Sequence, residues 1–433
     1  MAAATNTITT TSSLSTLMRQ VQTKAYKAAN FGYDEWNEFQ SGRLGPDFRV
    51  AWSTRSITVP LDLRYGIRAS SIPEGGYEAR PQSPALVDAS LSFIMINKRI
   101  TYSRLAEILR QRSREAFIEN DLKYQGMKAV EALREKFAMM AYGFSSGTVA
   151  KISSVSTDDI VLKDQHGISG LGSTSHNRRV VDQFHTDGTV GDFIAVLNPT
   201  GPALRSAGIV QITAIDRSTN TITCGASGIT SPTANDLIVF ANNNENTTLA
   251  SGTERNLNLV GLLDMLTSTS VHNISSSSEG TWAAGYADTA GGRFTPIDYR
   301  KMRQGIQNHG PKGSDLTDLW LAQGVYNDLV AQQEAGVRFQ GGGPFELDGA
   351  PTAKGVRIHQ SRFTPDGYAF AYDRNNSIKK GQLFPGPDEQ PFDEEGTDKL
   401  EDLSANVASL DFPIFLFTTS RGAMGYASGL TQQ

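Results

Sequence analysis

Between Thr101 and Tyr142, apolar residues recur at intervals of mostly three and four, which is the period of an amphipathic helix. Thr101 or Ser103 can cap the start of this helix, and Gly143 can end it. About 40 residues at about 1.5 Å each would span roughly 60 Å, far beyond a typical globular helix. The stretch is too charged for a membrane span, and its heptads are too irregular for a clean coiled coil. We therefore predict one long scaffold helix.

Before this helix the pattern becomes that of strands. Residues 50–59 and 87–93 are β-rich, and the stretch between them, 70–84, is dense in glycine and proline. They predict a long, two-stranded, protruding hairpin over residues 50–100. Because an isolated two-stranded ribbon is marginal in water, we expect it to lie against another subunit. Arginine suits flat, bidentate contacts to carboxylates, and it supplies all the basic residues from 49 to 80: Arg49, Arg55, Arg64, Arg68 and Arg80.

After the helix, about six short strands separated by turns lie between residue 147 and about residue 244. This spacing predicts a small β-barrel or sandwich, which we treat as an inserted β-rich domain. The rest of the chain is mixed α/β. Thr295 as cap and Pro296 at the first position predict a helix through Gln307. The further elements expected are a short helix or loop at 257–268, a buried strand at 319–322, a helix at 323–334, a glycine-rich loop at 336–349, strands at 355–359 and 367–372, and final strands at 406–412 and 415–419.

The first 30 residues are rich in Ala, Thr and Ser, and no acidic residue occurs before Asp34. A mitochondrial presequence shares this composition, but the basic residues are sparse, so we favour a flexible arm. Trp36 and Phe39 lie in the aromatic stretch that comes next. Aromatic residues on an arm commonly anchor it to a neighbouring surface, so both are candidate inter-subunit contacts.

Length and composition narrow the class of protein. A chain of 433 residues exceeds what one core supports, so two or more domains are expected. The net charge of -5 offers no strong basic field for nucleic acid. Cys224 is the one cysteine, which excludes an intrachain disulfide and a thiolate metal cluster. No apolar stretch approaches the roughly 20 residues of a membrane span.

Sequence motifs that suggest catalysis have simpler interpretations. The run Gly143–Gly147 matches G-x-S-x-G, but a nucleophile elbow needs a strand before it and a helix after it, which is the reverse of the order expected here. Surface positions are favoured over a metal site for the histidines of the β-rich region, His166, His176 and His185. The acidic run 387–395 can bind a cation weakly, although a solvated or inter-subunit loop is commoner. We predict no enzyme, no metal and no cofactor.

The order of parts resembles the major capsid protein of tailed bacteriophages, with its Hong Kong 97-type fold. The most specific runs are 261–264, 282–286, 295–298, 318–329, 345–351, 354–359 and 363–370. The resemblance implies an α+β fold with an N-terminal arm, an extended hairpin loop, a peripheral domain with a long spine helix, and an axial domain. The β-barrel-like insertion is a departure from the minimal fold. The implied parts are arm 1–49, hairpin 50–100, spine helix 101–143, insertion 144–250, axial domain 251–396 and peripheral return strands 397–433.

The resemblance further implies a subunit that assembles with itself into pentamers and hexamers of an icosahedral head. This head would enclose double-stranded DNA without sequence-specific binding, and the acidic charge balance suits that role. The implied partners are a separate scaffolding protein and a portal, with a decoration protein as an optional partner and no membrane. The protein would lie in the virion and, during assembly, in the host cytoplasm. The alternative is an encapsulin-like shell of a cellular compartment.

Three features of this sequence refine that expectation. Some family members cross-link a hairpin lysine to a neighbour's asparagine, but no lysine occurs between Lys27 and Lys98, so we expect a shell without cross-links. Other members begin with a long scaffolding segment; only about fifty residues precede the hairpin here, which favours a separate scaffolding protein. Gly126, inside the expected helix, costs roughly 1 kcal/mol relative to alanine and is a candidate hinge.

Overall fold

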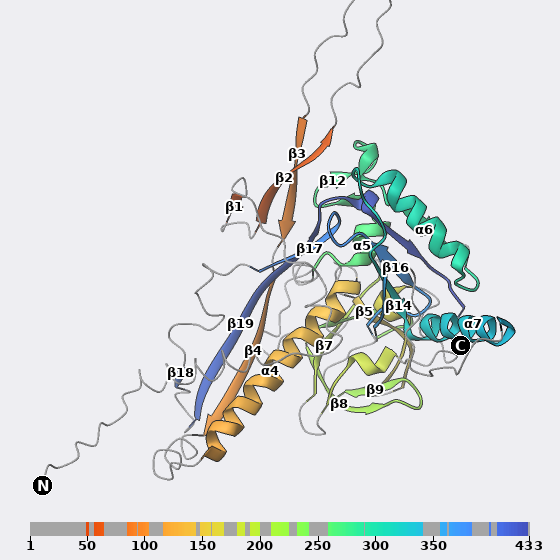
Figure 1. Ribbon diagram of the computed structural model, residues 1–433. Coiled ribbons are helices and arrows are strands. Elements are labelled where there is room, and N and C mark those ends of the chain that lie inside the picture. The colour runs from red at the N-terminus through yellow and green to blue at the C-terminus, as the bar shows by residue number, and fades with distance from the viewer. Residues whose placement is uncertain are drawn as a thin grey trace, which may run out of the picture. The chain divides into compact units, whose positions relative to one another are not determined.

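The structure is a computed structural model, drawn as a ribbon in Figure 1. Its chain forms two compact units. The first comprises Met1–Glu38, Phe93–Ala138 and Gly381–Phe415, and the second comprises Phe39–Ser92, Met139–Lys380 and Leu416–Gln433. The residues that the structure describes are 49–51, 56–64, 85–92, 94–103, 116–143, 148–156, 158–168, 180–186, 191–199, 209–224, 232–241, 259–289, 291–340, 356–361, 363–382, 398–399 and 405–431.

In the first unit, a long antiparallel pair of strands forms the main sheet. Strand β4 (Ile94–Ser103) pairs with β19 (Ala405–Thr418) from Ser103 opposite Ala405 to Ile94 opposite Ile414. The short strand β18 (Asp398–Lys399) and β17 (Ile378–Gln382) also pair with β19. The two final strands expected at 406–412 and 415–419 are thus one strand, since pairing with β4 continues through Pro413.

The long helix is shorter than the sequence predicts. Helix α4 comprises Ala116–Tyr142, which is 27 residues or about 40 Å. Thr101, as the expected start, is instead part of β4, and residues 104–115 lie outside the described part of the chain. The physical reason is that Ile94, Ile96 and Ile100 follow the two-residue period of a strand, and pairing with β19 continues that strand through Ser103.

The end of the helix agrees with the prediction. It stops at Tyr142, and the Gly143 N–H donates a hydrogen bond to the Met140 carbonyl. A strand, β5 (Thr148–Ser156), comes next. The G-x-S-x-G run therefore has a helix before it and a strand after it, which is not the arrangement of a nucleophile elbow.

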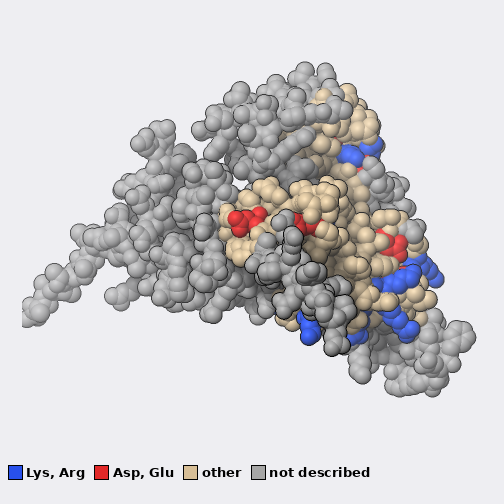
Figure 2. Space-filling model, turned by 90° about the horizontal axis from the view of Figure 1, so that it is seen from above, with Lys and Arg blue, Asp and Glu red and all other residues tan. Residues whose placement is uncertain are grey.

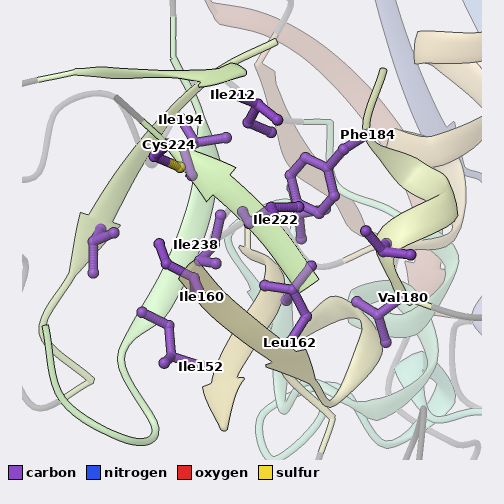
Figure 3. Packing of buried hydrophobic residues seen from close by; sticks show 14 of the residues in the cluster. Ile152, Ile160, Leu162, Val180, Phe184, Ile194, Ile212, Ile222, Cys224 and Ile238 are labelled. Carbon is purple, nitrogen blue, oxygen red and sulfur yellow. The ribbon is translucent and has the colours of Figure 1, made fainter. Parts of the chain in front are cut away.

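In the second unit, six strands close into a barrel, which is one of the two arrangements that the sequence predicts. In barrel order they are β10 (Leu237–Phe240), β5, β6 (Asp159–Lys163), β9 (Thr221–Cys224), β8 (Val210–Asp216) and β7 (Phe193–Leu197). Figure 3 shows its interior filled mainly by aliphatic side chains, with Phe184 at one side of the cluster. Closure leaves these six strands without a free sheet edge, so the barrel cannot pair with a neighbour by adding a strand to it.

A buried histidine corrects one expectation about the barrel region. His166, predicted at the surface, is 4% exposed in the 3-10 turn η2 (Gln165–Gly167), where it has a left-handed backbone conformation with φ of 53°. His185 is exposed as expected, and His176 lies outside the described residues. A turn at the end of β6 packs against β5 and buries the imidazole, which the spacing of the histidines does not reveal.

A mixed five-stranded sheet holds the rest of the second unit together. Its strand order is β13 (Tyr286–Asp288), β20 (Met424–Ala427), β16 (Ala369–Tyr372), β14 (Asp318–Ala322) and β15 (Arg357–Ser361). The pairs β13–β20 and β14–β15 are parallel, and the others are antiparallel. Two helices bury apolar side chains against one face of this sheet: α6 (Pro296–His309) and α7 (Gln323–Gln340).

The two helices test the predicted boundaries. Helix α6 begins after Thr295 with a capping box, in which the Asp298 carboxylate accepts a hydrogen bond from the Thr295 N–H at 2.9 Å. The Thr295 hydroxyl also donates to this carboxylate, at 2.7 Å. Helix α7 begins at Gln323 as expected but extends to Gln340, past the loop expected from Gly336. One glycine in a helix costs only about 1 kcal/mol, so Gly336 by itself does not end α7.

Candidate functional site

The hairpin is the predicted functional element that the structure describes in most detail. Strand β2 (Ser56–Arg64) pairs antiparallel with β3 (Ala85–Ser92), and β1 (Arg49–Ala51) adds to the outer edge of β2. The sheet thus has three strands rather than the expected two, which makes it more stable than an isolated ribbon. Alternate residues of β2 and β3 form its buried face: Ile57, Leu61, Leu63, Ala89 and Leu91.

Both strands of the hairpin are hydrogen-bonded to one short segment of the second unit. The Ser90 N–H of β3 donates to the His272 carbonyl at 2.9 Å. The Thr281 hydroxyl donates to the Leu63 carbonyl of β2 at 3.0 Å. We call the segment from Ser270 to Trp282 the hairpin root, because it is hydrogen-bonded to both strands.

A tight turn begins the hairpin root. Strands β11 (Ser270–Val271) and β12 (Ile274–Ser275) pair through a two-residue loop, His272 and Asn273, with φ of 54° and 63°. Two consecutive left-handed residues are the geometry of a type I′ hairpin turn, for which asparagine is well suited. This conformation aims the His272 carbonyl at the Ser90 N–H.

The His272 ring is buried and neutral. Its Nε2 accepts a long hydrogen bond of 3.4 Å from the Thr418 N–H, so the ring proton resides on Nδ1. Burial, with a smaller contribution from the nearby positive charge of Arg421, lowers the pKa of His272 to about 3. Within the described part of the chain, neither Nδ1 of His272 nor the indole N–H of Trp282 has a hydrogen-bond partner. Each such buried group costs about 1–3 kcal/mol.

Arg421 is the residue that holds the hairpin root together. It lies in the 3-10 turn η6 (Arg421–Ala423), is 3% exposed, and donates to four backbone carbonyls. Three of them lie in the last turn of α5 (Leu262–Thr267) or just after its end, at 2.5 Å for Met265, 3.3 Å for Leu266 and 2.8 Å for Ser268. The fourth is the Trp282 carbonyl at 3.0 Å.

The positive charge of Arg421 therefore interacts with the dipoles of backbone carbonyl groups. Burial lowers the pKa of Arg421 to about 10, so the side chain is still a cation at neutral pH. The exposed carbonyls at a helix C-terminus carry partial negative charge, and the guanidinium satisfies them directly. Its other contact, to Trp282, reaches the end of the hairpin root. One side chain thus joins α5, the root and η6.

Glycines allow the backbones around η6 to approach closely. A Cβ atom at Gly422 would lie 2.1 Å from the His309 carbonyl oxygen at the end of α6. A Cβ atom at Gly285 would lie 2.2 Å from the Gly422 carbonyl oxygen. Since backbone atoms cannot move aside as a side-chain tip can, only glycine fits at either position. The root, η6 and α6 are consequently one tightly packed group.

A second buried polar cluster lies on the face of the five-stranded sheet opposite α6 and α7. Asp318, fully buried, accepts from Arg357 Nη2 at 2.6 Å and contacts His359 Nε2 at 3.0 Å. Burial raises the pKa of Asp318, but hydrogen bonds from His359 and Thr317 and the Arg357 charge outweigh it, so the net shift is downward. The His359 ring stacks on Trp320, 4.4 Å between centroids. These contacts bind the edge strand β15 to β14, which is a structural role.

The other site residues predicted from sequence fall largely outside the described part of the chain. This is the position of Trp36, Phe39, Arg55, Arg68 and Arg80. Arg64 ends β2, where a β-bulge between Asp62 and Arg64 shifts the register. Gly126 lies within α4, so its place inside a helix is confirmed, whereas its role as a hinge stays a prediction.

Sequence reasoning missed Arg421 and His272. The run Ser420-Arg-Gly422 reads as a surface turn, and a single arginine gives no sign that it will be buried. The root turn had a usable signal: His272 and Asn273 separate two β-branched residues, Val271 and Ile274, as in a two-residue hairpin. Elsewhere in the described residues, no group of three or more His, Cys, Asp or Glu side chains could hold a metal ion. None of the described helices is both long enough and apolar enough to cross a membrane.

Comparison with known proteins gives matches to solved structures. No protein-family model and no curated protein sequence matches the chain. The capsid asymmetric unit of cyanophage A-1(L) is similar with a TM-score of 0.50 at 9% identity, over 94% of this chain and 95% of that chain. The chain has the fold of a tailed-phage major capsid protein.

Other solved structures are similar at lower scores. The capsid of an empty GTA particle matches with a TM-score of 0.43 at 10% identity, over 93% of this chain and 91% of that one. The SrpI encapsulin of Synechococcus elongatus matches 34% of this chain and 54% of its own, with a TM-score of 0.26 at 13% identity. The capsid fold therefore rests on the match to the cyanophage structure, which extends over nearly the whole chain.

Proposed function

We propose that this chain is the shell-forming subunit of a tailed-phage head, which assembles with itself into pentamers and hexamers around double-stranded DNA. The observation that carries the proposal is the likeness to the cyanophage capsid over nearly the full length of both chains. The three-stranded hairpin sheet supports it as well. Leu86 on β3 is 65% exposed, and an apolar side chain so exposed on a hairpin suits contact with another molecule.

Each part of the chain then has a role in the shell. The arm (1–49) and the hairpin (50–100) clasp neighbouring subunits, and the barrel (144–250) is an insertion relative to the minimal fold. Helix α4, with β4, β18 and β19, forms the peripheral domain, and the region of the five-stranded sheet forms the axial domain. The hairpin root is the joint at which the hairpin is fixed to its own subunit.

Charge supports a container for DNA rather than a DNA-binding protein. The chain carries a net charge of -5, and a shell that neutralised many phosphates would hold its genome tightly and impede packaging. Assembly would use a separate scaffolding protein and a portal, with a decoration protein as an optional partner. The product would be the virion head, assembled in the host cytoplasm.

Electron microscopy of particles containing the full chain tests this proposal. We expect closed icosahedral shells when the chain is coexpressed with its scaffolding protein. Native particles should protect double-stranded DNA from nuclease. A chain that stays monomeric under these conditions would contradict the proposal. Particles that contain a cargo enzyme and no genome would instead identify an encapsulin-like compartment.

A further inference from the structure

The outer face of helix α6 is basic in a chain that is acidic overall. Residues 293–315 contain five lysines and arginines and two carboxylates, a net charge of +3. Two of the cations are used within the subunit, because Arg293 pairs with Asp328 at 2.9 Å and Arg303 pairs with Asp315. Figure 2 shows basic side chains gathered along one side of the described surface, with acidic side chains mainly nearer its middle.

The remaining three cations are exposed. Arg300 and Lys301 are three and four residues after Ile297, which places Ile297, Arg300 and Lys301 on one side of α6. Lys312 follows three residues after the last residue of α6. Lys301 has only a loose contact of 3.6 Å with Asp298. Within the part of the chain that the structure describes, Arg300 and Lys312 have no ion pair. We call Ile297, Arg300, Lys301 and Lys312 the α6 stripe.

Ile297, an apolar residue beside these cations, indicates whether the partner is a phosphate group or a peptide. Ile297 is 62% exposed, and with Leu86 it is one of two large apolar side chains that stand out as exposed in the described residues. Phosphate groups would use the cations and leave Ile297 in water. A peptide that offers both carboxylates and an apolar side chain uses the whole stripe.

This chain contains a segment with that composition. Residues 387–395 read Pro-Asp-Glu-Gln-Pro-Phe-Asp-Glu-Glu, with five carboxylates, no cation, and Phe392 near the centre. We propose that the α6 stripe of one copy binds the 387–395 segment of a second copy, with Phe392 against Ile297 and the carboxylates on Arg300, Lys301 and Lys312. This proposal rests on the proposed self-assembly. It identifies two surfaces that would join one subunit to another.

Charge-reversal variants of the full chain test the contact in both directions. Each of Arg300→Glu/Lys301→Glu and Asp393→Lys/Glu394→Lys should raise the concentration needed for half-maximal assembly by about three- to tenfold, because it replaces two attractions with repulsions. Combining all four substitutions should restore assembly towards that of the unaltered protein. The matched control is Lys163→Glu/Arg217→Glu, which reverses two cations of the barrel and should leave assembly unchanged.

Zero-length carbodiimide cross-linking gives a second readout that does not require complete shells. Mixed particles or oligomers made from ¹⁴N- and ¹⁵N-labelled protein should yield cross-links from Lys301 or Lys312 to residues 388–395 in mixed-isotope pairs. Cross-links within one isotope only would show that the contact lies inside a single copy, which overturns the proposal. The proposal is also overturned if the variant with all four substitutions assembles no better than either variant with two.

The two proposals fail in different ways. If the unaltered chain gives neither particles nor mixed-isotope cross-links, self-assembly itself is wrong. If the chain builds shells and Arg300→Glu/Lys301→Glu builds them equally well, the α6 stripe is not the contact. Normal shells that retain less DNA in that variant would assign the stripe to nucleic acid, which also overturns the contact between copies.

Discussion

Replacing Arg421 with methionine should loosen the hairpin from its own subunit. Methionine has a similar length and no charge, so the substitution removes the four hydrogen bonds to Met265, Leu266, Ser268 and Trp282 without opening a large cavity. Each carbonyl left without its charged donor costs at least about 1 kcal/mol, a loss of about 4 kcal/mol or more. Methionine avoids the cost of burying a charge, which offsets part of this loss.

The expected net change in the free energy of unfolding is about 3–5 kcal/mol, the range found when a buried charged group loses its partners. That corresponds to a fall of about 10 °C in the unfolding temperature of the second unit. Amide hydrogen exchange should speed up at Ser90 and Thr418, because both N–H groups bond to His272 beside the guanidinium. Differential scanning calorimetry and exchange mass spectrometry measure the two effects.

A matched control is Arg217→Met in the barrel. The Arg217 side chain is 67% exposed and pairs with Asp182 at 2.9 Å, so its loss should change stability by less than about 1 kcal/mol. Arg421→Lys should be intermediate, since an ammonium keeps the charge but reaches fewer of the four carbonyls. An unfolding temperature of Arg421→Met within about 2 °C of that of the unaltered protein would correspond to a loss of roughly 1 kcal/mol or less. That result would show that the four hydrogen bonds do not hold the root.

Four further predictions concern other parts of the chain. Asn220→Ala removes buried hydrogen bonds to Val181 and Leu162 at a residue with φ of 58°. It should lower the free energy of unfolding of the barrel, measured with urea, by about 3 kcal/mol. Asn220→Gly should lower it by about 1 kcal/mol less, because glycine adopts a positive φ without strain. Hydrogen bonds from Ser218 and Thr219 lower the pKa of Asp216 from 3.8 to about 2, so its contribution to stability should persist above pH 4 and be lost as pH falls towards 2; an NMR titration midpoint near 3.8 would contradict this. Denaturing gels of mature particles should show no high-mass ladder, since residues 28–97 contain no lysine. Gly126→Ala in α4 should slow shell expansion by stiffening the helix; unchanged expansion kinetics and procapsid yield would make Gly126 a packing residue only.

The sequence predicted elements best where local chemistry and packing agree. Thr295, Pro296 and Asp298 form a complete helix start, and the structure has α6 there. The barrel strands also follow from β-rich stretches and turn residues, because strands such as β6 and β8 place alternate side chains in one shared core. In both cases the local signal already contains the reason for the fold.

The sequence-based predictions are wrong where the structure of a segment depends on a partner far away in the chain. Thr101–Ser103 fit the helical period of residues 105–142, yet they pair with Ala405, Asn406 and Val407, some 300 residues away in the chain. No local pattern gives that partner. Arg421 and His272 show the same limit for side chains, since their burial depends on α5, the hairpin and η6 meeting at one place. The turn at His272 and Asn273 had a signal in the sequence, but the burial of Arg421 and His272 did not.

The contacts of Arg421 and of the α6 stripe differ in their physical character, and this difference suits a shell subunit. Arg421 holds the root through carbonyl groups at 3% exposure, so dissolved salt screens these bonds little and no carboxylate needs to be ionised. The α6 stripe is exposed, so ions in solution weaken its attraction to residues 387–395 within about one Debye length. A subunit built in this way keeps its own hairpin attached at salt concentrations that weaken its contact with a neighbouring subunit. Weak, screened contacts between copies let a misplaced subunit leave, while the strong contacts inside each copy keep the building block intact.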